Sequence, residues 1–231
     1  ATVALQNDSE EAANVTVGAV VLDSNGNEVS SESRTTAAIP SKGTSSVSLA
    51  ATVNSPKLWS VSSPNLYTMR VKIYNASNEE IDRYDTDFGY RTTYWDASTG
   101  FYLNGESTKL KGVCLHSDSG ALGAVQNYDA IYRQMTILKD MGVNAVRTSH
   151  NVASQTFIDV CNDIGMLVME EFFDGWDSPK NGNTNDFSRY FSVKIDSKNK
   201  LVDKKADETW AQFVVDQTVK RDRNSPSIII W

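Results

Sequence analysis

Hydrophobic and polar residues alternate along the first part of the chain with the period of a β-strand. Residues 15–21 place an apolar side chain at every second position, the pattern of a half-buried strand. The pair Asn25-Gly26 follows and is a strong signal for a tight hairpin turn. Further strands are predicted over residues 1–5, 46–53, 66–74 and 81–90. Short antiparallel strands with frequent turns predict an immunoglobulin-like β-sandwich over residues 1–94.

From about Trp95 the pattern changes to strands that alternate with helices. Apolar residues recur every three or four positions over residues 128–141, which predicts a helix that ends at Gly142. Strands are predicted over residues 110–115, 143–147, 166–169 and 228–231, and helices over 128–141, 154–164 and 206–221. This alternation predicts a parallel sheet, in either a doubly wound fold or a barrel. Four strands are too few to close a barrel.

Polar residues directly follow three of these predicted strands. The side chains concerned are His116 and Asp118 after the first strand, Arg147, His150 and Asn151 after the second, and Glu170, Glu171, Asp174 and Trp176 after the third. Each residue alone has an ordinary structural explanation, such as the start of a solvated loop. Because the carboxyl ends of parallel barrel strands carry the active site, three successive polar ends together favour a binding site.

Composition excludes several functional classes. The 231-residue chain has a net charge of -7, which argues against a nucleic-acid or anionic-membrane partner. No apolar run approaches the roughly 18 residues that a membrane span needs. The two cysteines, Cys114 and Cys161, lack metal-site spacing and are expected to be small buried hydrophobic residues. No signal peptide is recognised, but a preceding segment would hide one, so cytoplasmic and secreted locations both stay open.

Six passages together resemble one enzyme family. They are FGYR at 88–91, FYLNG at 101–105, KGVCLHSD at 111–118, NAVRTSHN at 144–151, MEEFFDGW at 169–176 and RDRNSPSIIIW at 221–231. On these passages the chain resembles glycoside hydrolase family two, which includes β-galactosidases, β-glucuronidases and β-mannosidases. The resemblance implies a sandwich over residues 1–94, followed by the first half of a (β/α)8 TIM barrel over residues 95–231. The enzyme it implies is a retaining β-glycosidase, most like a β-galactosidase.

The resemblance also implies roles for the polar residues at the strand ends. Arg147 would orient the nucleophilic carboxylate and hold it ionised, for which a guanidinium fork is well suited. The residues expected to bind sugar are His116, Asp118, His150, Asn151, Glu171, Asp174 and Trp176. The acid/base and nucleophile glutamates of the family would lie beyond Trp231. No catalytic residue is therefore assigned in this chain, which alone is expected to be inactive.

Three positions depart from the family pattern. Cys114 stands where relatives commonly have Asn, Ser117 stands where many have a second His, and Val152 stands where a proline is usual. Some β-galactosidases bind magnesium with Glu and His from the loop after the third strand. That loop has no His here, so no cofactor or metal is expected in this chain, and magnesium belongs only to the complete protein by resemblance.

The resemblance leaves alternatives open. The expected partner is a β-galactoside or another carbohydrate, and a homo-oligomer is also open. The chain is expected either to self-associate or to show disorder in its barrel half, because the missing half of the barrel would cover apolar residues such as Ile228 and Ile230. A β-glucuronidase or a β-mannosidase of the same family is the nearest alternative to a β-galactosidase. A non-catalytic carbohydrate-binding or scaffold protein is the alternative from another class.

Overall fold

A computed structural model describes residues 1–175, 178–202 and 204–231. The chain divides into two compact units. The first comprises residues 1–59 and 65–90, and the second comprises residues 60–64 and 91–231.

The first unit is a β-sandwich of two antiparallel sheets. Its strands are β1 (Thr2–Gln6), β2 (Ala13–Leu22), β3 (Ser33–Ile39), β4 (Thr44–Ser48), β5 (Tyr67–Tyr74) and β6 (Glu80–Phe88). One sheet has the order β3-β2-β5-β6, and β1 pairs with β4 to form the other. Val15, Val17 and Ala19 point into a core that also holds Leu5 and Val71, as the alternating pattern predicted.

One strand prediction in this unit was wrong. The strand expected over residues 46–53 is observed as β4, which ends at Ser48. Leu49 is buried and its N–H still bonds to the Ala1 carbonyl, but the chain after it leaves the sheet. An apolar residue at a strand end can therefore fill the core without extending the strand, and its hydropathy does not mark the boundary.

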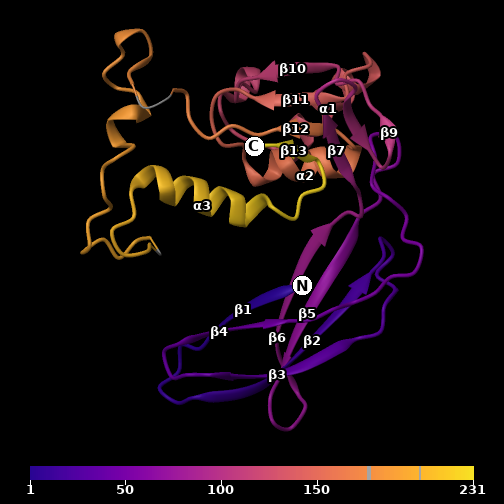
Figure 1. Cartoon of the computed structure of the whole chain (residues 1–231), viewed down its shortest axis with the longest axis vertical. Coiled ribbons are helices and arrows are strands. Elements are labelled where there is room, and N and C mark those ends of the chain that lie inside the picture. The colour runs from indigo at the N-terminus through magenta and orange to yellow at the C-terminus, as the bar shows by residue number, and fades with distance from the viewer. Residues whose placement is uncertain (176–177, 203) are drawn as a thin grey trace. The chain divides into compact units, whose positions relative to one another are not determined.

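The second unit contains a four-stranded parallel sheet with its helices. A small antiparallel sheet precedes it, formed by β7 (Thr93–Asp96), β8 (Gly100–Leu103) and β9 (Glu106–Ser107). The parallel strands are β10 (Gly112–Leu115), β11 (Ala145–Thr148), β12 (Leu167–Met169) and β13 (Ile228–Ile230). They lie side by side in chain order (Figure 1). This order is that of the first four strands of a (β/α)8 barrel, as predicted.

Each of the three helices begins at a residue whose side chain caps it. They are α1 (Tyr128–Asp140), α2 (Gln155–Ile164) and α3 (Trp210–Asp222). Ser154 caps α2 by accepting from the Phe157 N–H, and Gly165 ends it in the left-handed conformation. The prediction that α3 begins near residue 206 was wrong. Thr209 and Gln212 form a capping box that starts the helix at Trp210.

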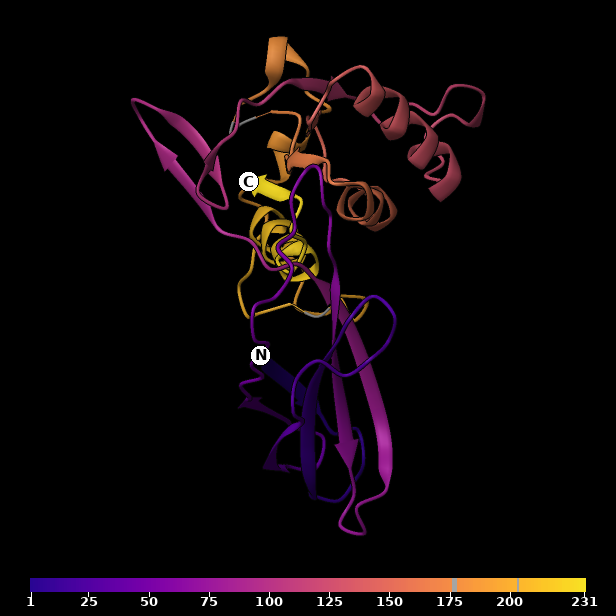
Figure 2. The same ribbon diagram turned by 90° about the vertical axis from the view of Figure 1, so that its right-hand side faces the viewer.

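The parallel sheet has two faces with different roles. On one face, Val146 and Val168 pack against Met135 of α1 and Ile158 of α2 in a buried core, and Figure 2 shows both helices on the same side of the strands. Ile228 belongs to this core and is only 4% exposed, so the expectation that it lies uncovered was wrong. The opposite face carries the in-register residues Cys114, Arg147 and Met169.

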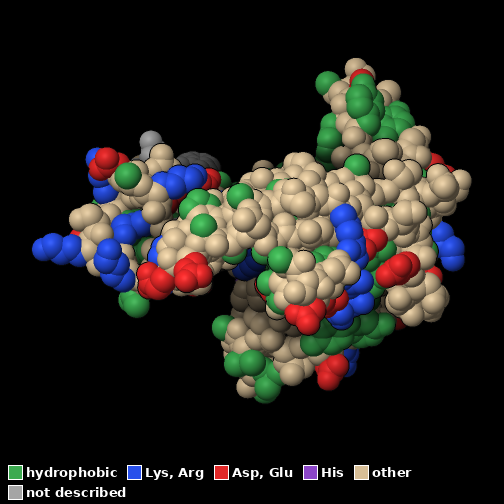
Figure 3. Space-filling model, turned by 90° about the horizontal axis from the view of Figure 1, so that it is seen from below, with side chains coloured by type: hydrophobic (Ala, Val, Ile, Leu, Met, Phe, Trp, Pro, Cys, Tyr) green, Lys and Arg blue, Asp and Glu red, His purple; other side chains and the backbone are tan. Residues whose placement is uncertain are grey.

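The surface carries charges of both signs. Lys and Arg side chains lie among Asp and Glu side chains on the face seen in Figure 3. None of the helices within the described residues is long and apolar enough to span a bilayer.

Candidate functional site at the carboxyl ends of the parallel strands

An ion pair joins the ends of two neighbouring strands. Arg147 lies in β11, and Glu171 follows the end of β12. Arg147 Nη2 and Nε lie 2.5 Å and 2.6 Å from Glu171 Oε1. The Glu171 backbone N–H also donates to the Thr148 hydroxyl at 3.0 Å. The carboxylate is therefore fixed both through its side chain and through its backbone, at the edge where a barrel places its chemistry.

His150 completes this network from the loop after β11. Its Nδ1 lies 3.2 Å from Glu171 Oε2 and 3.4 Å from Arg147 Nη2. A carboxylate can only accept, and Arg147 Nη2 already donates to Glu171, so we assign the ring proton to Nδ1, from which it is donated to Glu171. In the neutral ring Nε2 is then left as a hydrogen-bond acceptor for a further group.

His116 and Cys114 lie beside this network. The His116 and His150 ring centroids are 5.3 Å apart in an edge-to-face arrangement. Arg147 Nη1 donates to Cys114 Sγ at 3.4 Å, and this bond, with a contribution from Ser149, lowers the pKa of the Cys114 thiol. The expectation that both cysteines are buried was wrong for Cys114, which is exposed, because alternation along β10 turns it away from the helix-side core.

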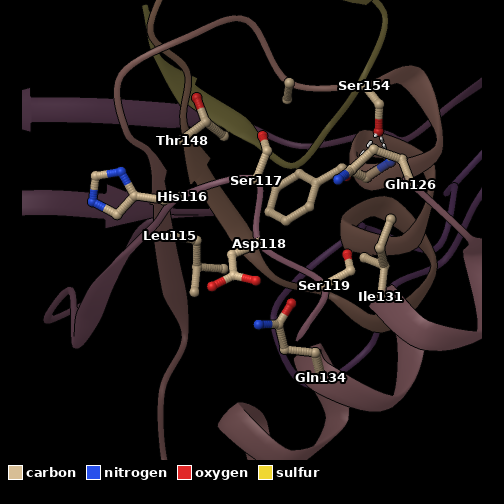
Figure 4. Close-up of a pocket in the computed structure, with 12 residues that line it drawn as sticks. Leu115, His116, Ser117, Asp118, Ser119, Gln126, Ile131, Gln134, Thr148 and Ser154 are labelled. Atoms are coloured by element: carbon tan, nitrogen blue, oxygen red, sulfur yellow. Dashed lines mark hydrogen bonds between the residues drawn. The ribbon is translucent and has the colours of Figure 1, made fainter. Parts of the chain in front are cut away.

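Asp118 and Asn151 stand apart from the ion pair. Asp118 Oδ1 accepts from the Gly120 N–H at 2.9 Å and so shapes its own turn. A cavity of about 30 Å³ lies behind this turn, and Figure 4 shows that the His116 ring points away from the other side chains that line it. This volume suits one water rather than a sugar. Asn151 is exposed directly after His150.

Asp174 lies further along the loop after β12. Its Oδ1 is 2.9 Å from Lys180 Nζ, and this lysine lowers the pKa of the Asp174 carboxyl. Both side chains are about half exposed, so the pair is accessible to solvent. Trp176, expected to stack on a sugar ring, lies outside the described residues.

Aromatic residues anchor the same loop, a feature that the sequence analysis missed. Phe173 stacks on Phe187 with ring centroids 4.5 Å apart and contacts Phe191 at 4.9 Å. Phe172 stacks on Trp231 at 6.1 Å. These contacts hold a short 3-10 helix, Phe187–Tyr190, near the end of β12. The spacing of Phe187, Tyr190 and Phe191 by three and four residues is the sequence signal that could have predicted this helix.

Glu170 differs sharply from its neighbour Glu171. Its place among the polar residues after the third strand predicts a position in the binding site, and this prediction was wrong: Glu170 is only 1% exposed. It lies beside Asp222, the last residue of α3, which is 0% exposed, and near Arg221, whose side chain is 37% exposed. Burial first, and then the charge of Asp222, raise the pKa of Glu170 above its ordinary value. Successive residues after a strand point to opposite sides, so only one of the two glutamates can face the site.

The carboxylates of the strand ends do not gather around a metal position. Within residues 1–175, 178–202 and 204–231, no three His, Cys, Asp or Glu side chains form a group suited to hold a metal ion. No chemical step is therefore assigned to a metal in this chain.

Comparison with known proteins adds a family to this geometry. Residues 97–231 match the family model described as glycosyl hydrolases family 2, TIM barrel domain, and residues 1–91 match the model described as glycosyl hydrolases family 2. A β-galactosidase of Bacteroides ovatus is 38% identical over 228 residues, which cover 98% of this chain and 24% of that protein. A putative β-glucuronidase of Formosa agariphila is 41% identical over 179 residues, which cover 78% of this chain and 16% of that protein.

A solved structure has the same arrangement over the entire chain. It is a glycosyl hydrolase family 2 member from Bacteroides cellulosilyticus, with a TM-score of 0.85 and 33% identity. The match covers 100% of this chain and 27% of that one. The chain thus spans about a quarter or less of the length of these three proteins.

Proposed function

The chain belongs to glycosyl hydrolase family 2, and from this premise we propose that the complete protein hydrolyses terminal β-galactosides with retention of configuration. The observation that carries the proposal is the Glu171 carboxylate, held between Arg147 and His150 at the carboxyl edge of the parallel sheet. A braced carboxylate beside two histidines suits the recognition of neutral hydroxyl groups. Relatives named β-galactosidase support galactose as the sugar.

Each member of the network keeps capacity for a ligand. Glu171 Oε1 accepts twice from Arg147, whereas Oε2 accepts only from His150, which leaves a lone pair for a sugar hydroxyl. His150 Nε2 and the exposed His116 ring supply two further positions for hydroxyl groups. Arg147 Nη1 has one N–H beyond the bond to Cys114, which we assign to the nucleophilic carboxylate. We assign Asp118, Asn151 and Asp174 to the outer part of the same sugar site, and Trp176 stays a predicted sugar-binding residue.

The catalytic pair is proposed to lie outside this chain. Retention requires two carboxyl groups about 5 Å apart, one to protonate the leaving oxygen and one to attack the anomeric carbon. The described carboxylates at these strand ends are engaged otherwise: Glu170 is buried, Glu171 pairs with Arg147, Asp174 pairs with Lys180, and Asp118 holds its turn. The 231-residue chain alone is therefore expected to be inactive.

A β-glucuronidase is the second candidate, because relatives with that name match a large part of the chain. A glucuronide carries a carboxylate, for which an unpaired cation is the natural partner. Of the cations nearest the ends of β11 and β12, Arg147 already pairs with Glu171 and Lys180 with Asp174. This pairing supports a neutral sugar over a uronic acid.

A substrate panel tests the proposal. The complete protein is assayed with aryl β-galactoside, β-glucuronide and β-mannoside. We expect the highest kcat/KM with the galactoside. A higher kcat/KM with the glucuronide or the mannoside would replace galactose as the sugar. Binding of galactose without hydrolysis of any of the three would overturn the enzymatic proposal in favour of a carbohydrate-binding protein.

A further inference from the structure

A buried charged cluster lies directly beside the site. Glu170 and Asp222 are both inaccessible to solvent, and Arg221 is the cation between them. Arg221 Nε and Nη2 donate to Asp222 Oδ1 and Oδ2 at 2.7 Å and 2.5 Å. The same Nη2 lies 3.7 Å from Glu170 Oε1, which is too far for a hydrogen bond. The Arg221 guanidinium thus donates its hydrogen bonds to Asp222 and none to Glu170.

The two carboxyl groups cannot both be ionised at low cost. Two buried carboxylates with one partly exposed guanidinium carry a net charge of -1, and one bound proton makes the cluster neutral. Neither oxygen of Glu170 has a donor in hydrogen-bond geometry among the described residues, and the Ala153 backbone N–H is the donor that acts on its carboxyl from nearby. A carboxylate has only acceptors, so a proton on Glu170 is what allows a bond to Asp222. On α2, Asp159 is a further charge that acts on Arg221.

The cluster connects the two loops that carry the site residues. Arg221 Nη2 donates to the Ala153 carbonyl at 2.7 Å, in the loop that contains His150. Glu170 directly precedes Glu171, and its N–H donates to the Ile230 carbonyl of β13 at 3.0 Å. Three successive strand ends are therefore joined through this group of side chains.

We propose that Glu170, Arg221 and Asp222 form a positioning cluster, in which the two carboxyl groups share one proton, and which fixes the loops that present His150 and Glu171. The sugar-binding significance of those loops rests on the proposed function. The shared proton and the loop positions are properties of the chain itself. The cluster acts through its neighbours and touches no reacting atom.

The shared proton is tested by carbon-13 NMR of the 231-residue chain labelled in glutamate. The Glu170 carboxyl signal is the one absent in Glu170→Gln. We expect it at the protonated position at pH 7, where exposed glutamates are ionised. In Asp222→Asn, the amide replaces the negative neighbour and donates to Glu170, so the titration should shift to lower pH. A Glu170 carboxyl that is ionised at pH 7 in the unmodified chain would overturn the shared proton.

The positioning role is tested through the two histidines, which are the only ones in the chain. Nitrogen-15 NMR of labelled histidine reports the tautomer and surroundings of the His150 ring. We expect the His150 signals to shift in Glu170→Ala and in Arg221→Lys, and to stay in place in Glu170→Gln, which keeps the shape and a donor. Unchanged His150 signals in a folded Arg221→Lys chain would refute the positioning role. This test stands on Arg221→Lys alone, so it remains decisive if Glu170→Ala does not fold.

Glu208→Gln is the matched control. Glu208 is another largely buried glutamate, 6% exposed, and it accepts from the Lys205 N–H away from the cluster. It should leave the His150 signals unchanged. None of these readouts requires sugar turnover, so a complete protein that fails to hydrolyse galactosides would remove the proposed function without affecting the cluster.

Discussion

Each unit of the molecule contains an arginine–carboxylate pair with similarly short contacts, and the surroundings of the two pairs differ. In the sandwich, Arg70 Nη2 lies 2.7 Å from Asp85 Oδ2, and the two residues face each other across β5 and β6. At the parallel sheet, Arg147 Nη2 lies 2.5 Å from Glu171 Oε1. Both arginine side chains are partly exposed, at 28% and 36%. Contact distance and exposure therefore do not distinguish the two pairs.

The two ion pairs differ in the number of strands and loops that contribute residues around them. The Arg70 pair belongs to one pair of antiparallel strands, where a cross-strand ion pair contributes modestly to the stability of the sheet. The Arg147 pair meets His150 from a loop and Cys114 from a third strand. Only parallel strands bring three carboxyl ends to one edge, so the topology turns an ordinary ion pair into a candidate site.

The largest expected effect is a difference in kcat between variants of the two arginines, Arg147 and Arg70. In the complete protein, Arg147→Ala should lower kcat on the order of 100-fold, because we assign it to the orientation of the nucleophile. Arg70→Ala is the matched control and should leave kcat unchanged. Steady-state hydrolysis of an aryl β-galactoside measures both. Equal losses in the two variants would refute the distinction.

His150→Ala should have the next largest effect. It removes a hydrogen bond to Glu171 and the proposed bond to a sugar hydroxyl. We expect kcat/KM for the galactoside to fall roughly 10-fold to 100-fold. His150→Gln, which keeps a donor and an acceptor, should recover part of the loss. A wild-type kcat/KM in His150→Ala would contradict the role in sugar binding.

Glu170→Gln should change how stability depends on pH. The pKa of Glu170 is raised in the folded chain, so the folded state keeps a proton that the unfolded state releases above the ordinary pKa of 4.5. The Glu170 contribution therefore favours folding below that value and is lost as pH rises towards the folded pKa. The slope is at most about 1.4 kcal/mol per pH unit. Urea unfolding between pH 4 and 9 should show a flatter profile for Glu170→Gln, and an identical slope would contradict it.

The smallest effect is expected for the stability of the sandwich. Arg70→Ala removes one cross-strand ion pair that solvent partly screens. The urea midpoint of the chain should hardly change at moderate salt, and the small change should vanish at high salt. A large loss of stability in Arg70→Ala that persists at high salt would contradict this expectation. It would show that the Arg70–Asp85 pair is more than an exposed cross-strand ion pair.

Much of this architecture could be predicted from the sequence. The family resemblance and the fold class are confirmed by the family models and by the solved relative. The parallel order of β10 to β13 followed from strand–helix alternation with short links. Arg147, His150 and Glu171 could be expected at one edge because Arg147 lies near the carboxyl end of a parallel strand and the other two follow such ends. Their roles in sugar binding stay predictions.

The difference in burial between the adjacent residues Glu170 and Glu171 could not be predicted from the sequence. Glu170 and Glu171 have the same chemistry, and only the direction in which each side chain leaves the strand decides which one is buried. The burial of Glu170 further depends on Arg221 and Asp222, about fifty residues later in the chain. The exposure of Cys114 depends likewise on the register of β10 against β11. The burial of these side chains is decided by tertiary packing, which the local pattern of hydrophobic and polar residues does not specify.

Hydrolysis of an aryl β-galactoside by the purified 231-residue chain and by the complete protein tests the central claim most directly. The account predicts turnover by the complete protein and none by the chain, because the sugar-binding edge is present here and the catalytic carboxyl pair is assigned elsewhere. Clear turnover by the 231-residue chain, free of host galactosidase, would contradict that assignment.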